Sequence, residues 1–275
     1  MAFQVDGISH AGSIRKSNAD RFLVGRIERS LEVLAVSGDV GAPGLIPSGA
    51  GGHILVVADG IGASEFGHEA SSLAVETILN HFTRPLSLGR GEINLEDDLV
   101  TELGKVILDS HANVAKEASE KPDRKGMATT LTMAFVLGNR AWITHVGDSR
   151  AYLVRGSEAI LLTKDQTIAQ MLVDSGALDA DAAESSRLKH ILASAVGGSS
   201  TEAPEVLSYN VTLNNGDGLV LCTDGLNKHV SEAEIGGVVS GTGSPSEACR
   251  KLLEMTLAAG GSDNVTVIVG KMSAD

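Results

Sequence analysis

Short apolar runs rich in valine, isoleucine and leucine recur along the chain, and each ends at glycine, aspartate or another turn-forming residue. Runs of this length and composition are typical of buried strands. They predict strands over residues 22–27, 32–36, 53–58, 129–137, 141–146, 151–154, 159–162, 206–213, 218–222 and 264–270. The pattern therefore predicts a fold with extensive β-structure.

Two longer segments carry apolar residues at spacings of three and four, which is the pattern of a helix that buries one face. They predict helices over about 66–82 and 95–119. Two more helices are expected after Ser231 and Ser244, because each serine is followed three residues later by glutamate, as in a capping box. Pro245 suits the first position of the second of these helices, and a glycine pair is expected to end it.

The helices come in pairs between groups of strands, without regular βαβ alternation. This order favours two antiparallel sheets covered by helix pairs over a doubly wound parallel sheet. We therefore predict an α+β fold, a four-layer α-β-β-α sandwich, formed by a single domain over residues 1–275. The Gly- and Pro-rich stretch 37–52 is interpreted as a long loop, and 166–189 shows a broken helical pattern.

Composition narrows the class of protein. The 275 residues are 43% hydrophobic and 21% charged, as in a globular protein. The formal net charge of -13 argues against nucleic acid as a partner, because phosphate backbones bind basic surfaces. No apolar run is long enough for a membrane span and no signal peptide is visible. Two cysteines without a CxxC motif fit the reducing cytoplasm, where we expect a monomer.

Four aspartates stand where predicted strands stop or start: Asp59, Asp148, Asp224 and Asp263. A lone Asp-Gly after a strand is usually a turn, with glycine supplying positive φ. Four such carboxylates at the ends of apolar strands instead predict convergence on one rim, if the strands lie side by side. Converging carboxylates repel one another, and the repulsion is relieved by a cation.

Clustered carboxylates select hard cations such as Mg²⁺, Mn²⁺ or Ca²⁺ over zinc. Because one Mg²⁺ usually keeps several waters, this many carboxylates favour two ions that share a bridging ligand. Such a pair suits in-line attack of water on phosphate. Arg15, near the start of the chain, could hold a phosphate dianion in a bidentate fork, although an isolated arginine there is more often simply exposed.

At these residues the chain resembles the metal-dependent protein phosphatases of type 2C, in their compact bacterial form. The resemblance covers about residues 5–270, and its six short elements occur in family order. The elements are Arg15 with Asn18-Ala19-Asp20, Asp59-Gly60-Ile61-Gly62, Gly147-Asp148-Ser149-Arg150, Thr163-Lys164-Asp165, Asp224-Gly225-Leu226 and Asp263-Asn264.

The resemblance implies a serine/threonine phosphatase in which a water or hydroxide bridging two Mn²⁺ or Mg²⁺ ions attacks the phosphorus. Asp59 would bridge the ions, with the Gly60 carbonyl as a further ligand. The other ligands by position are Asp224 and Asp263 at one ion, Asp20 at the other, and Asp148 at a third, weaker site. Arg15 would bind the substrate phosphate, so the implied catalytic residues are Arg15, Asp59 and Asp224. Residues of about 165–190 would form a flap.

Three departures from the family pattern stand out. Ala19 replaces a glutamate, which removes a carboxylate from the surroundings of one ion. Ile61 and Ser64 stand where a histidine often follows the Asp-Gly element, so protonation of the leaving group falls to metal-bound water. The loop over 37–52 is long for a compact member. His68 does not match a family histidine by spacing, and Cys222 is interpreted as a buried structural thiol.

Three functions follow from these residues. The favoured one is a phosphatase acting on phosphorylated proteins, and the family resemblance implies that a serine/threonine kinase or its targets are among them. An alternative is a pseudophosphatase that binds a phosphorylated partner through a weakened metal site, which Ala19 and the missing histidine motivate. The third is a metal-dependent hydrolase of small phosphate esters.

Overall fold

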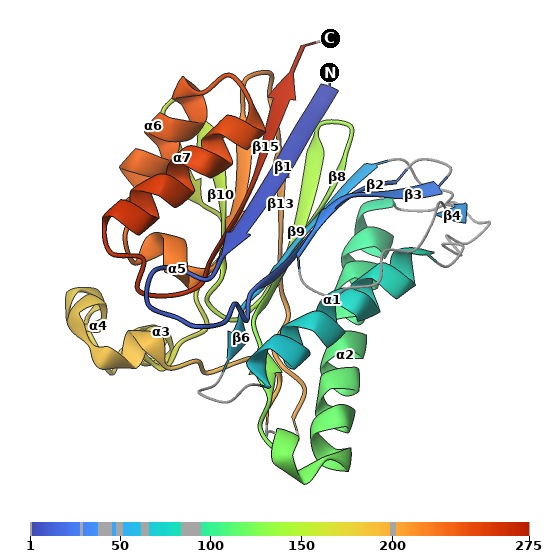
Figure 1. Cartoon of the computed structure of the whole chain (residues 1–275), viewed down its shortest axis with the longest axis vertical. Coiled ribbons are helices and arrows are strands. Elements are labelled where there is room, and N and C mark those ends of the chain that lie inside the picture. Colours follow the sequence, from blue (N-terminus) through green and yellow to red (C-terminus); the bar gives the residue numbers. More distant parts are fainter. Residues whose placement is uncertain are drawn as a thin grey trace.

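The computed structural model describes residues 2–27, 30–37, 46–47, 52–61, 66–83, 95–198 and 202–274 (Figure 1). The chain ends lie side by side, because the first and last strands pair with each other. Of the loop predicted over 37–52, positions 37, 46, 47 and 52 are described. The remainder of that loop, together with Gly62 and Ser64, lies outside the described residues.

The first sheet is antiparallel throughout its described pairs. Its strands, in spatial order, are β1 (Ala2–His10), β15 (Val265–Ser273), β14 (Gly218–Cys222), β10 (Arg150–Arg155) and β11 (Glu158–Leu161). Both chain ends therefore belong to this sheet.

The second sheet is also antiparallel throughout its described pairs. Its strands, in spatial order, are β13 (Leu207–Thr212), β9 (Arg140–Val146), β8 (Leu131–Leu137), β5 (Gly52–Ala58), β2 (Arg21–Ile27), β3 (Ser30–Val36) and β4 (Ile46–Pro47).

Helices cover the outer face of each sheet (Figure 1). The helices α1 (Gly67–Thr83) and α2 (Leu95–Glu120) pack on the second sheet. The helices α5 (Asp224–Asn227), α6 (Glu232–Gly241) and α7 (Pro245–Ala258) pack on the first sheet. The four-layer α-β-β-α sandwich predicted from the order of elements is confirmed.

Three apolar layers hold this sandwich together, one between the sheets and one under each set of helices. Neighbouring residues of one strand enter different layers: Leu23 faces α1 and α2, whereas Val24 faces the other sheet. Side chains alternate between the faces of a strand. A strand covered on both faces is therefore apolar at every position, which explains the continuous apolar runs in the sequence.

Short elements occupy the end of the sandwich nearest the aspartates. A small sheet joins β6 (Gly60–Ile61), β7 (Ala128–Thr129) and β12 (Val196–Gly197). Beside it, α3 (Ile168–Asp174), α4 (Ala180–Ser185) and the 3₁₀ turn η2 (Arg187–His190) make up the range predicted to be a flap; a second 3₁₀ turn, η1 (Pro122–Arg124), follows α2. The role of the range 165–190 as a flap stays a prediction.

Several details differ from the sequence prediction, among them the short strands β4, β6 and β12, which were not predicted. Strand β1 was not predicted, because its nine residues mix polar and apolar types and none of them is fully buried. The predicted strand 129–137 is two strands separated at Thr130, and the turn of helix α5 was missed. Ser231 forms the expected capping box. At Ser244 the box is incomplete, because Glu247 accepts a hydrogen bond from the Gly243 N–H instead.

Candidate metal centre

Antiparallel pairing brings the strand-end aspartates together. Asp20 precedes β2 and Asp59 follows β5, and these strands are neighbours with Arg21 opposite Ala58. Asp224 follows β14 and Asp263 precedes β15, which are neighbours in the other sheet. In each antiparallel pair the end of one strand lies beside the start of the next, so all four residues reach the same edge of the sandwich.

A cavity of about 800 Å³ opens at this edge. Among its lining residues are five of the predicted ligands, Asp59, Gly60, Asp148, Asp224 and Asp263, together with Arg15, Ala19 and Lys228. Asp20 is fully buried and does not line the cavity. The structure thus gathers every predicted site residue at or directly beside one cavity.

The backbone of Asp59 is held by hydrogen bonds to Thr129 and Thr130. Its N–H donates to the Thr130 hydroxyl at 3.0 Å, and its carbonyl accepts from the Thr130 N–H at 2.9 Å and from the Thr129 hydroxyl at 2.8 Å. The break between β7 and β8 at Thr130 is therefore part of the site, because it orients the residue that the sequence predicts to bridge two ions.

The glycines after Asp59 and Asp224 serve packing and not a turn. Neither Gly60 nor Gly225 has positive φ, so the turn interpretation of these Asp-Gly pairs is wrong. A Cβ at Gly60 would overlap the carbonyl of Gly67, and one at Gly225 would overlap the carbonyl of Asn264. Glycine is required there because another backbone passes too close for any side chain.

Asp20 is oriented by two hydroxyl groups. Its Oδ2 accepts hydrogen bonds from Thr223 and Thr266, both at 2.8 Å. Thr223 directly follows β14 and Thr266 is the second residue of β15, so both lie more than 200 positions from Asp20 in sequence. Sequence reasoning missed both of them, since a threonine beside a strand end carries no signal of its own.

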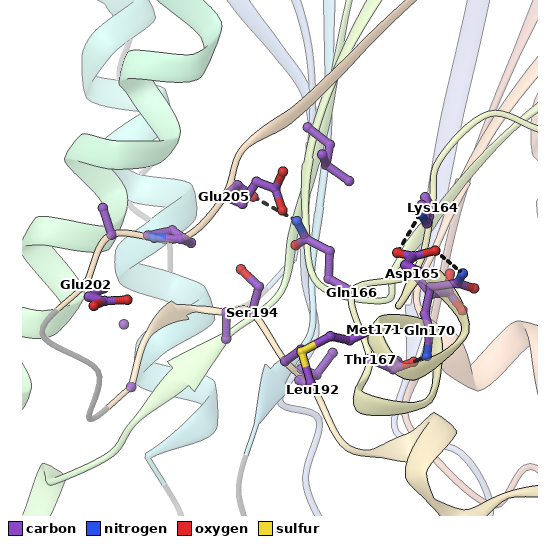
Figure 2. Close-up of a pocket in the computed structure, with 18 residues that line it drawn as sticks. Lys164, Asp165, Gln166, Thr167, Gln170, Met171, Leu192, Ser194, Glu202 and Glu205 are labelled. Carbon is purple, nitrogen blue, oxygen red and sulfur yellow. Dashed lines mark hydrogen bonds and ion pairs between the residues drawn. The ribbon is translucent and has the colours of Figure 1, made fainter. Parts of the chain in front are cut away.

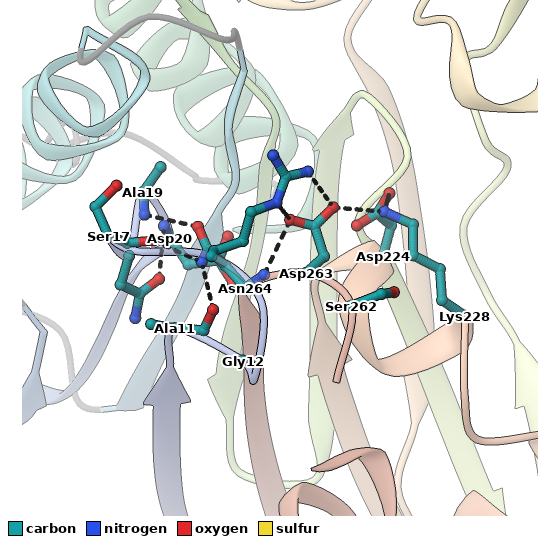
Figure 3. Close-up of polar contacts among 12 residues, drawn as sticks. Ala11, Gly12, Ser17, Ala19, Asp20, Asp224, Lys228, Ser262, Asp263 and Asn264 are labelled. Carbon is teal, nitrogen blue, oxygen red and sulfur yellow. Dashed lines mark hydrogen bonds and ion pairs between the residues drawn. The ribbon is translucent and has the colours of Figure 1, made fainter. Parts of the chain in front are cut away.

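Asn264 ties the N-terminal segment to the last strand (Figure 3). Its amide donates to the carbonyls of Ala11 and Ser17, and its Oδ1 accepts from the N–H of Ala19 at 2.8 Å. This side chain therefore positions the loop that carries Arg15 and Asp20. The resemblance had singled out Asp263-Asn264, and the structure explains why an asparagine is useful there.

Burial and mutual repulsion raise the pKa of three of these carboxyl groups. Burial raises the pKa of Asp20 to about 7, partly offset by the hydroxyls of Thr266 and Thr223. Burial also raises the pKa of Asp148 to about 7, with Asp224 adding to the effect. The pKa of Asp59 is raised well above its usual range by burial and then by the charge of Asp20. Added positive charge would stabilise all three in ionised form.

Two cations hold the other side of the site (Figure 3). Arg15 donates to Asp263 through Nε at 2.8 Å and Nη2 at 3.0 Å. Lys228 Nζ lies 2.6 Å from Asp224 Oδ2 and 2.8 Å from Asp263 Oδ2. Burial alone would raise the pKa of Asp263, but the hydrogen bonds from Arg15 and Lys228 lower it below its ordinary value.

The donors fit a hard divalent cation, with one condition. All the clustered side-chain donors are carboxylate oxygens, and Asp20 Oδ1 and Asp224 Oδ1 are buried with no hydrogen-bond partner. Yet within the described ranges no three acidic, histidine or cysteine side chains stand in an arrangement that would hold an ion. The condition is that Asp224 and Asp263 turn away from the lysine and arginine that now engage them.

Two further parts of the family pattern have structural partners. Arg150 donates to both oxygens of Asp165, at 2.9 and 2.8 Å, and the Thr163 hydroxyl accepts from the Ala151 N–H. These contacts fasten the segment after β11 to β10. His68, which spacing did not favour, nevertheless lines the site cavity, as does His190. Cys222 is fully buried, as predicted.

A second cavity, of about 610 Å³, adjoins the first. Figure 2 shows the residues that line this second cavity. The two share Leu192 and Ala195 among their lining residues. Met171 and Thr167 from the range predicted to be a flap line the second cavity, opposite Glu205. Part of the predicted flap therefore lies next to the aspartate cavity.

The sequence profile of the protein phosphatase 2C family matches residues 45–256. The chain is 32% identical over 225 residues to the serine/threonine protein phosphatase PstP of Mycobacterium tuberculosis. The matched region covers 80% of this chain and 40% of PstP. It is 31% identical over 216 residues to the serine/threonine phosphatase Stp of Listeria innocua, covering 78% and 83%. The chain therefore belongs to the protein phosphatase 2C family.

A solved structure extends the similarity to three dimensions. The catalytic domain of PstP in complex with two manganese ions is similar with a TM-score of 0.72 and 28% identity, covering 99% of each chain. The chain spans about 40% of the full PstP sequence that it matches. Among the described residues, no helix combines the length and the apolar character needed to cross a bilayer.

Proposed function

We propose that this protein is a metal-dependent serine/threonine protein phosphatase that hydrolyses phosphoserine and phosphothreonine in other proteins. The observation that carries the proposal is that Asp59, Asp148, Asp224 and Asp263 line one cavity together with Arg15. Membership of the protein phosphatase 2C family and the names of the relatives support it.

We assign metal binding to the clustered carboxylates and one carbonyl. The assigned groups are the side chains of Asp20, Asp59, Asp148, Asp224 and Asp263 and the backbone carbonyl of Gly60. The proposed cofactor is Mn²⁺ or Mg²⁺, as two ions with a third, weaker site at Asp148. The oxygen donors and the two manganese ions of PstP support this choice. When bound, the ions supply an activated water at neutral pH and neutralise charge on the phosphoryl oxygens.

The residues of the chain divide the remaining work. Asp59, whose backbone is fixed by Thr130, would hold the ions with its carboxylate. Asp20, held by two threonine hydroxyls, contributes negative charge from beneath the cavity. Arg15, whose side chain is 55% exposed, is able to leave Asp263 and grip the substrate phosphate with its planar fork.

Metal-dependent turnover tests the proposal. Hydrolysis of a phosphothreonine peptide and of p-nitrophenyl phosphate is expected to need Mn²⁺ or Mg²⁺ and to cease in EDTA. Asp59→Asn should lower kcat about a thousandfold, since metal catalysis is worth several kcal/mol. Asp109→Asn, an exposed change on α2, is the matched control. Full activity of Asp59→Asn would contradict the proposed centre.

The same assay separates the other two functions. Bound metal without turnover of any phosphopeptide would favour the pseudophosphatase, which none of the named relatives supports. Faster turnover of free phosphoserine than of a phosphoprotein would favour a hydrolase of small esters.

We also propose that the chain is one catalytic domain that acts as a cytoplasmic monomer in signal transduction. Its substrates would include a serine/threonine kinase or the targets of one. The buried, unpaired Cys222 and Cys249 support a reducing compartment. The three continuous apolar layers support one domain. Size-exclusion chromatography with light scattering tests the monomer.

A further inference from the structure

Lys228 lies between two of the carboxylates assigned to metal binding. Its residue follows α5 directly, and its Nζ is 2.6 Å from Asp224 Oδ2 and 2.8 Å from Asp263 Oδ2 (Figure 3). The side chain is only 26% exposed and lines the site cavity. One ammonium group therefore bridges the ends of β14 and β15 across the mouth of the site.

Lys228 carries a positive charge, as lysine ordinarily does at neutral pH. Burial lowers the pKa of its ammonium, but Asp224 and Asp263 outweigh burial, so the pKa stands above the ordinary lysine value. Among the described residues that line the cavity, Arg15 is the other side chain with a fixed positive charge. Arg15 donates to Asp263, whereas Lys228 contacts both Asp224 and Asp263.

Lys228 engages one oxygen of each of two carboxylates that we assign to metal binding, Asp224 Oδ2 and Asp263 Oδ2. A divalent cation and an ammonium group at the same carboxylate repel each other strongly at short range, because both are positive. The two oxygens of Asp224 differ: Oδ2 pairs with Lys228, whereas Oδ1 is buried with no hydrogen-bond partner. Lys228 thus pairs with two of the carboxylate oxygens assigned to metal binding and leaves Asp224 Oδ1 without a hydrogen-bond partner.

We propose that Lys228 is a built-in counter-ion that competes with the divalent cation for Asp224 and Asp263. It stabilises the protein without metal by neutralising two converging carboxylates, and it weakens metal binding because its positive charge repels an ion at the same carboxylates. The inference rests on the proposed metal site. It adds that one residue of this chain sets how much metal the enzyme needs.

Calorimetric titration with Mn²⁺ and thermal unfolding with and without Mn²⁺ test the inference on the full chain. Lys228→Met keeps an unbranched side chain that is only one atom shorter, and it removes the charge. It should bind Mn²⁺ at least tenfold more tightly than the wild type, unfold at a lower temperature in EDTA, and gain more from saturating Mn²⁺. Lys228→Arg keeps the charge and should stay within about threefold of wild-type affinity.

Lys121→Met is the matched control, because Lys121 also pairs with a carboxylate four residues away, Glu117, but does not line the site cavity. It should leave Mn²⁺ affinity unchanged. Lys228→Gln provides a second neutral variant if the methionine variant folds poorly, and it should again bind Mn²⁺ more tightly.

A neutral variant that binds Mn²⁺ more tightly but is less stable in EDTA distinguishes the counter-ion role from a structural or a phosphate-binding role. If Lys228 were purely structural, its replacement would lower the unfolding temperature equally with and without Mn²⁺. If Lys228 bound the substrate phosphate, its replacement would raise KM without changing the affinity for Mn²⁺. Either result overturns the inference. Wild-type binding of Mn²⁺ with unchanged affinity in both neutral variants overturns the inference alone. Absence of Mn²⁺ binding in wild type and variants alike would overturn the proposed metal site as well.

Discussion

The two sides of the site hold their carboxylates by different means. On the inner side, Asp20 is fully buried and is held by the neutral hydroxyls of Thr223 and Thr266. On the outer side, Asp263 is partly exposed and is held by the cations Arg15 and Lys228. The inner carboxyl therefore has a raised pKa and the outer one a lowered pKa.

This difference shows where a cation is needed and where one is already present. Hydroxyl groups orient a carboxylate without cancelling its charge, so the inner side gains most from an added ion. Ammonium and guanidinium groups cancel the charge, so the outer side has to exchange one cation for another. Metal loading is thus expected to depend on charge at the inner side and on competition at the outer side.

The strongest test of the inner side is removal of its charge. Asp20→Asn keeps the shape and the contacts to threonine but loses a full negative charge, so Mn²⁺ affinity should fall about a hundredfold, the upper range for residues that support a metal site. Phosphopeptide turnover should recover in part at high Mn²⁺. Calorimetric titration measures the effect, with Asp6→Asn on β1 as the control.

A smaller loss is expected when only the orientation of Asp20 is disturbed. Thr266→Val removes one of the two hydroxyls at Asp20 Oδ2, so the pKa of Asp20 should rise further and Mn²⁺ affinity should fall about tenfold near neutral pH. Thr77→Val, on α1 away from the site, is the matched control. Unchanged affinity in Thr266→Val would mean that the hydroxyl serves folding alone.

Restoring a carboxylate near the inner side should have a modest effect of opposite sign. Ala19 lines the cavity directly before Asp20, and the family has glutamate there. Ala19→Glu should tighten Mn²⁺ binding by roughly threefold to tenfold, within the range of supporting residues, and lower the Mn²⁺ concentration for half-maximal turnover. A metal optimum identical to that of the wild type would show that the alanine is no defect.

The smallest effect is expected in the pH dependence of stability. The pKa of Asp20 in the folded, metal-free protein is about 7, against an ordinary value of 3.8. Between these values the folded state binds more protons than the unfolded chain, so stability falls as pH rises. In EDTA, the unfolding temperature of the wild type should therefore fall as the pH is raised from about 5 to about 8. The fall should be a few degrees larger than in Asp20→Asn, which lacks this carboxyl group.

Much of the fold could be predicted because burial on both faces leaves a local trace. The apolar runs of β2, β5 and β14 mark strands covered from two sides, and the spacing in α1 marks a helix covered from one. Strand β1 left no such trace. Its residues become a strand only because β15 offers them a partner at the other end of the chain.

The site also has one part that the sequence predicts and one part that it does not. Which aspartates matter could be predicted from their place at strand ends and from the family pattern. Their partners could not: the hydrogen bond from Thr266 to Asp20 spans 246 positions, and the overlap that excludes a side chain at Gly225 comes from Asn264. Neither contact has a local signature.

By itself, therefore, the sequence determined the order of strands and helices and the supply of carboxylates at strand ends, because periodicity and residue type are local properties. Only the tertiary structure decided that Asp20 meets hydroxyls while Asp263 meets cations, and that Lys228 stands between Asp224 and Asp263. Those outcomes depend on distances between residues far apart in the chain, and electrostatic energy is set by such distances.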